Sequence, residues 1–202
     1  MNNATVPTAD MHLESPRETQ NWRPLVNWAL AIPHLVIANA LGNLANLMSV
    51  VSWFSIVFTG RMPGGIVRFQ CMILRYEARA YSYVMFLRRP YPEFEFDTAV
   101  GDSGHDPLRV DFAPQAADRN RVTVAFRIVL IIPVLIYMAL VVVAAAFAVI
   151  AAAIAVLFTG RWPKGLRTFV LDAGRLTLRV GAYGRLLTDT YPTFALSSPT
   201  SM

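Results

Sequence analysis

The sequence predicts an all-α integral membrane protein with an internal duplication. Of its 202 residues, 55% are hydrophobic and only 15% are charged, whereas about a quarter of a soluble domain is charged. Residues 24–60 and 128–160 contain no Asp, Glu, Lys or Arg, and charge-free apolar runs of this length indicate transmembrane helices. The stretch FTGRMPGG at residues 58–65 recurs as FTGRWPKG at residues 158–165.

The repeat extends over most of the chain at an offset of one hundred residues. Pro33 aligns with Pro133 before the FTGR motif, and matching Phe, Arg, Tyr and Pro residues follow it up to Phe94 and Phe194. The chain therefore divides into a polar N-terminal lead (1–21), a first membrane repeat (22–97), an acidic polar linker (98–118), a second membrane repeat (119–196) and a C-terminal tail (197–202).

Four short motifs of the first repeat indicate a family. They are AIPH at residues 31–34, FTGRMPGG, RYEARAYSY at 75–83 and YPEF at 91–94. The second repeat has IIPV, FTGRWPKG, RLTLRVGAY and YPTF in their places. Each unit thus resembles the DUF4389 domain, a family of uncharacterised bacterial membrane proteins. The resemblance implies a bacterial membrane location and brings no known activity.

Each repeat should begin with a short interfacial helix followed by a spanning helix. A straight helix over residues 24–60 would be about 55 Å long, at about 1.5 Å per residue, against a hydrocarbon core of about 30 Å. Pro33 and Pro133 predict a kink, so we expect leads at 22–32 and 121–132 and spans at 33–58 and 133–158. In an alternative arrangement each tract folds into two short helices joined by a turn. Only the first tract has a sequence typical of such a turn, at residues 41–43.

The FTGR motif is typical of a turn at which the chain leaves the membrane. Gly60 and Gly160 follow the spans as helix C-caps. Arg61 and Arg161 can then reach lipid headgroups, and the proline two residues later can start the next helix. This interpretation gives the motif a structural role and no chemistry.

The helix after each turn carries a polar stripe that allows two placements. The helix can lie in the interface with its arginines on lipid phosphates, or it can return through the bilayer and bury them against partners. Parallel copies require a returning helix and four spans, which we favour; two spans and an inverted pair are the alternative. The stripe residues are Arg68, Arg75 and Arg79 in the first repeat and Asp172, Arg175 and Arg179 in the second.

Polar side chains within the first apolar tract are candidate contact residues. Asn39, Asn43 and Asn46 fall on one helical face, whereas the second tract has no Asn or His. They favour a helix-docking face held by hydrogen bonds between helices. His34 could in principle ligate a haem, but the second repeat has Val134 in its place, and we expect no cofactor or metal.

The sequence favours a non-catalytic membrane protein. It contains no P-loop, dinucleotide fingerprint, zinc-protease motif or nucleophile elbow, so we expect no enzyme. Seventeen of the eighteen bases are arginine, which suit lipid phosphate or buried carboxylates better than nucleic acid. We expect a multi-pass accessory or scaffold subunit of the inner (plasma) membrane that contacts lipid and docks on a larger membrane complex or forms a homo-oligomer. The alternative is a small transporter or channel with its path between the repeats.

Overall fold

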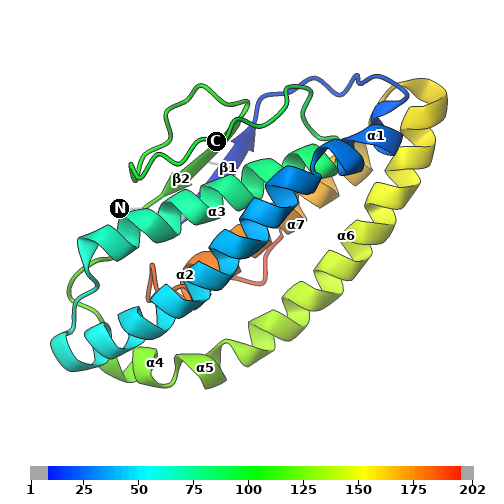
Figure 1. Cartoon of the computed structure of the whole chain (residues 1–202). Coiled ribbons are helices and arrows are strands. Elements are labelled where there is room, and N and C mark those ends of the chain that lie inside the picture. Colours follow the sequence, from blue (N-terminus) through cyan, green and yellow to red (C-terminus); the bar gives the residue numbers. More distant parts are fainter. Residues whose placement is uncertain (1–8, 197–202) are drawn as a thin grey trace, which may run out of the picture.

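The computed structural model describes residues 9–196 and is mostly helical (Figure 1). Two of its helical segments, Ile32–Thr59 and Arg127–Thr159, are long and apolar enough to cross a membrane. In chain order the elements are β1 (Ala9–Leu13), α1 (Arg23–Leu30), α2 (Ile32–Thr59), α3 (Gly64–Val84), β2 (Leu108–Phe112), α4 (Arg121–Ala125), α5 (Arg127–Leu130), α6 (Ile132–Thr159) and α7 (Lys164–Gly184).

The two main helices of each repeat, α2 and α3 in the first and α6 and α7 in the second, have the same bounds one hundred residues apart, whereas the lead is one helix (α1) in the first repeat and two (α4 and α5) in the second. The helix breaks at Ala31, so that Pro33 lies in the first turn of α2, where its missing N–H costs no hydrogen bond. Gly60 and Gly160 end α2 and α6 in the left-handed conformation, with φ of 72° and 65°, which glycine adopts without steric cost. The predicted proline breaks and glycine caps are therefore confirmed.

The two repeats are antiparallel, so the parallel arrangement expected from the sequence is wrong. Strand β1 pairs antiparallel with β2, Ala9 opposite Phe112 and Leu13 opposite Leu108. The long helices α2 and α6 also run in opposite directions, as the colours in Figure 1 show. A constant offset in sequence records the duplication but carries no information on how the copies are oriented.

Each FTGR turn binds the segment that leads into the other repeat. The N–H of Trp162 donates to the carbonyl of Arg17 (3.0 Å) and that of Thr19 to the carbonyl of Gly160 (2.9 Å). In the other half, Met62 donates to Ala116 (2.9 Å) and Arg119 to Gly60 (3.4 Å). This exchange fixes the antiparallel arrangement, because neither turn is completed by its own repeat.

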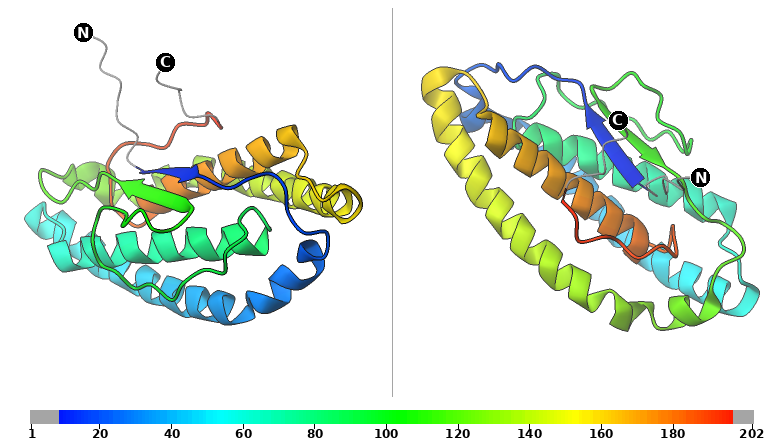
Figure 2. Two further views of the ribbon diagram at one scale, coloured as in Figure 1. Left: turned by 90° about the horizontal axis from the view of Figure 1, so that it is seen from above. Right: turned by 180° about the vertical axis from the view of Figure 1, so that it is seen from behind.

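Helices α3 and α7 lie between the two-stranded sheet and the long helices (Figures 1 and 2). They pack against each other through a core that includes Cys71, Leu74, Leu178 and Ala182. Burial of such apolar side chains is the main favourable term in folding. The linker and β2 cover α3, while β1 covers α7, so we call the sheet with the linker the polar cap.

Candidate functional site

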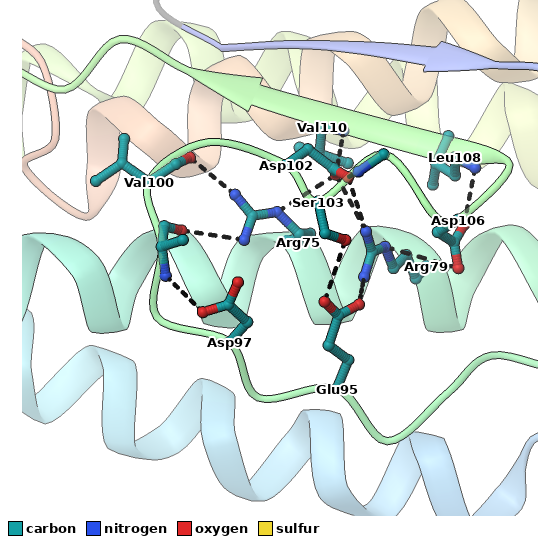
Figure 3. Close-up of polar contacts among 12 residues, drawn as sticks. Arg75, Arg79, Glu95, Asp97, Val100, Asp102, Ser103, Asp106, Leu108 and Val110 are labelled. Atoms are coloured by element: carbon teal, nitrogen blue, oxygen red, sulfur yellow. Dashed lines mark hydrogen bonds and ion pairs between the residues drawn. The ribbon is translucent and has the colours of Figure 1, made fainter.

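The linker folds over α3 and encloses two arginines of the polar stripe (Figure 3). Arg75 donates to the carbonyls of Ala99 (3.1 Å) and Val100 (2.8 Å). Arg79 donates to the carboxylates of Glu95 and Asp102. Both arginines are buried, so their charges face the linker and are shielded from solvent.

Asp102 is the centre of this network. Its carboxylate lies 3.1 Å from Arg79 and 3.4 Å from Arg75, and it also accepts the N–H groups of Gly104 and Val110. Its side chain is only 3% exposed. Acidic segments with Gly, Pro and Ser are usually solvated loops, but the linker is enclosed by protein at Asp102. Buried charges are tolerated when they are paired and hydrogen-bonded in this way.

A second ionic cluster joins the end of α7 to the lead into α6. Asp189 accepts hydrogen bonds from Arg119 (2.7 Å), Arg127 (2.6 Å) and the N–H of Asn120 (2.8 Å). Burial raises the pKa of the Asp189 carboxyl, but these hydrogen bonds and the charges of the two arginines outweigh burial and leave the pKa below its ordinary value. The carboxylate therefore stays ionised at neutral pH.

The stripe of the second repeat has different partners. Arg175 donates to Asp172 on its own helix (2.7 Å) and to the carbonyl of Met11 in β1 (3.1 Å). Arg179 donates to Thr193 and Ala195 in the exit segment of its repeat. These contacts tie α7 to the sheet and to the chain end, and the guanidinium groups of both residues are turned toward protein.

The other predicted contact residues are exposed. Arg61, Arg68 and Arg161 lie near the ends of the long helices with their side chains open to the surroundings. Asn39, Asn43 and Asn46 are also exposed on α2, where Asn43 donates to Asn39 (3.2 Å). The structure thus leaves these two sets available to lipid or to a partner, whereas it encloses Arg75 and Arg79.

His34 lies in an aromatic cluster at the start of α2. Its Nδ1 is 2.8 Å from the hydroxyl of Tyr76, and its ring stacks on Phe94 with centroids 4.2 Å apart. Tyr91 packs against the ring edge. The AIPH and YPEF motifs of the first repeat therefore meet in space, and His34 anchors the exit segment to α2. Among the residues described, no group of His, Cys, Asp and Glu has metal-binding geometry.

Apolar side chains of α2 and α6 are exposed along the length of both helices. Exposed aromatic and aliphatic residues follow both helices from end to end, including Phe147 (69% exposed) and Phe158 (84% exposed). Monomeric soluble proteins rarely expose contiguous apolar patches of more than a few hundred Å². We call the exposed sides of α2 and α6 the apolar face; it carries no charged residue.

The sequence predicts that Asp172 pairs with Arg175 one helical turn away, as the structure shows (2.7 Å), but the other partners of the arginines were missed. Asp106, which pairs with Arg88 (2.7 Å), and Asp189 were not singled out. Glu77 of α3 pairs with Arg185, just after α7, across the two repeats (2.7 Å), and was missed as well. One signal was present, since seven of the thirteen acids lie between residues 93 and 118, beside a stripe of arginines that needed counter-charges.

These features define a mostly helical protein with two helical segments long and apolar enough to cross a membrane, a charge-free apolar face on one side and an ion-paired polar cap on the other. The chain belongs to the family described as a domain of unknown function (DUF4389), which matches residues 22–95 and again residues 121–195. The two tandem copies predicted from the motifs are therefore confirmed. No curated protein and no solved structure matches the chain.

Proposed function

We propose that this protein is a non-catalytic accessory or scaffold subunit of a bacterial plasma membrane, immersed through its apolar face. The observation that supports this most directly is the segregation of side chains. Exposed apolar residues cover α2 and α6, whereas exposed carboxylates, such as Asp111 and Asp118, lie on the polar cap. A surface divided in this way suits a boundary between hydrocarbon and water.

The orientation we propose places α2 and α6 along the membrane plane. The charged linker runs beside α3 for much of its length, so upright helices would carry exposed cap charges, such as Arg109, to mid-membrane depth. Charged groups there cost several kcal/mol, on the order of 3 or more by insertion scales. Antiparallel repeats also remove the reason for favouring four crossings. The nearest alternative is that each repeat crosses the membrane once, so that the two repeats form an inverted pair.

The scaffold role rests on the asparagine row of α2. Asn39, Asn43 and Asn46 are exposed on a helix that is otherwise apolar, and amide groups in hydrocarbon are stabilised by hydrogen bonds to another helix. The second repeat has Ala139, Val143 and Ala146 at the equivalent positions. A partner helix that offers hydroxyl or amide groups would therefore bind the first repeat only. The transporter alternative gains no support from the interface between α3 and α7, whose core consists of buried apolar side chains.

Membrane immersion can be measured with spin labels on introduced cysteines in the full chain reconstituted into liposomes. Labels at Ile136, Phe147 and Phe158 should be accessible to oxygen and protected from a water-soluble nickel complex, because all three are exposed on the apolar face. If α6 lies along the membrane plane, their depths should be similar. An upright α6 would instead place Phe147 deepest, with the other two near the surfaces.

A label at Arg109 on the polar cap is the matched control for this scan, and it should be accessible to the nickel complex. Native Cys71 can be retained, since it is buried and burial raises the pKa of its thiol to about 11, which leaves little reactive thiolate at neutral pH. Nickel accessibility at Phe147 equal to that at Arg109 would contradict immersion.

Docking can be tested with a photo-crosslinking amino acid at Asn43, and with the same substitution at Val143 as control. In native membranes Asn43 should crosslink to one protein at a defined mass, while Val143 should crosslink mainly to lipid. Both side chains are exposed at equivalent places of the two repeats. If the two positions gave the same crosslinked products, a docking role for the asparagine row would be contradicted.

A further inference from the structure

Basic side chains gather where the end of α6 meets the N-terminal segment. The cluster, which we call the basic end, comprises Arg17, Arg23, Arg89, Arg161, Lys164 and Arg167. Contacts with the segment around Glu18 hold it together. Arg89 donates to the carbonyl of Glu18 (2.8 Å), Arg161 lies 3.3 Å from its carboxylate, and Arg23 donates to the carbonyl of Arg89 (2.6 Å).

Among residues 9–196, the basic end has an excess of positive charge. The one salt bridge that its six bases form within that range joins Arg161 to Glu18 (3.3 Å). Burial and the neighbouring charge of Arg17 lower the pKa of Arg167. Like charges held together in this way are stabilised by an anion from outside the chain.

The surroundings of the basic end indicate the kind of anion. A cavity of about 280 Å³ is lined by Pro16, Arg17, Glu18 and Arg161. Phe158, the most exposed large apolar side chain of α6, precedes Arg161 by three residues, and Trp22 is exposed on the adjoining segment. A ligand at this place would meet guanidinium groups and membrane-immersed aromatic rings together, as a lipid does at the headgroup level.

We propose that the basic end binds the phosphate headgroups of anionic phospholipids in the membrane that holds the apolar face. This inference rests on the proposed immersion and specifies where and through which charges the protein prefers anionic lipid. Arginine suits the task because its planar guanidinium donates two parallel hydrogen bonds to phosphate. Arg17, Arg161 and Lys164 are exposed and supply the primary contacts.

The test compares two triple variants of the full chain in detergent micelles that contain phosphatidylglycerol and phosphatidylcholine. The first carries Arg17→Gln, Arg161→Gln and Lys164→Gln; the second, its control, carries Arg61→Gln, Arg68→Gln and Arg121→Gln at the opposite end. Native mass spectrometry measures the ratio of the two retained lipids. Each basic residue near an anionic surface strengthens binding by about fivefold. The ratio of retained phosphatidylglycerol to phosphatidylcholine should therefore fall by at least about tenfold in the first variant and by much less in the control.

Equal losses in the two variants would overturn the proposal, because lipid preference would then follow total charge. A wild-type protein with no preference, or one whose basic end retains RNA in place of phosphatidylglycerol, would also overturn it. Immersion is measured separately by the spin labels on α6, so either failure leaves that result standing. Unchanged melting temperatures establish that both variants fold.

Discussion

Replacing Asp189 with Asn is expected to lower the free energy of unfolding by about 3–5 kcal/mol, the usual cost of removing one partner of a buried ion pair. The substitution leaves Arg119, with a fully buried side chain, and Arg127 without their carboxylate. Thermal unfolding of the detergent-solubilised chain measures the effect. Glu18→Gln is the control, since its pair with Arg161 is exposed and contributes about 0–1 kcal/mol.

Ionisation of Asp189 should also make the stability of the fold depend on pH in the acid range. Its folded-state pKa lies below the unfolded value, which is about 3.9 for Asp. Ionised Asp189 therefore stabilises the fold fully above that value, and this stability is lost as the pH falls through the folded-state pKa. Between about pH 5 and pH 2 the Asp189→Asn variant should lose less stability than the wild type. If the free energies of unfolding of the two proteins fell equally with pH, Asp189 would not be the source of the acid dependence.

Replacing Asp102 with Asn should destabilise the first repeat to a similar extent, by about 3–5 kcal/mol. Arg75 and Arg79 are both buried beneath the linker and would lose the negative charge between them. Asp97→Asn, just before the linker, is the matched control, because that carboxylate is exposed. Hydrogen exchange should show the loss first in β2, whose Val110 N–H is bound by Asp102.

Partial rescue separates the ion pair from packing in this cluster. If desolvated charge is the cause, adding Arg79→Met to Asp102→Asn should restore part of the stability, since apolar replacement of a whole buried pair is often nearly neutral. A double variant less stable than Asp102→Asn alone would instead assign the effect to the remaining contacts of Arg79 with Glu95 and Asp106.

Local structure was predictable because it depends on residues close together in the chain. The charge-free tracts became α2 and α6, the glycines of the FTGR motif cap them, and the helices break just before Pro33 and Pro133. The family was predictable from the same short motifs. The partners of Arg75 and Arg79 were not, because Arg79 and Asp102 lie twenty-three residues apart in the chain and the linker contains several other acids that could have served.

The sequence by itself determined the apolar tracts, the turns between helices and the repetition of both, since proline, glycine and uninterrupted hydrophobicity act over a few residues. Only the tertiary structure decided that the copies are antiparallel, that each FTGR turn binds the lead of the other repeat, and that Arg75 and Arg79 face the linker. The physical reason is that these outcomes depend on which backbone groups and charges find partners across the whole fold. Many pairings would satisfy the same local pattern, and the packed core between α3 and α7 selects among them.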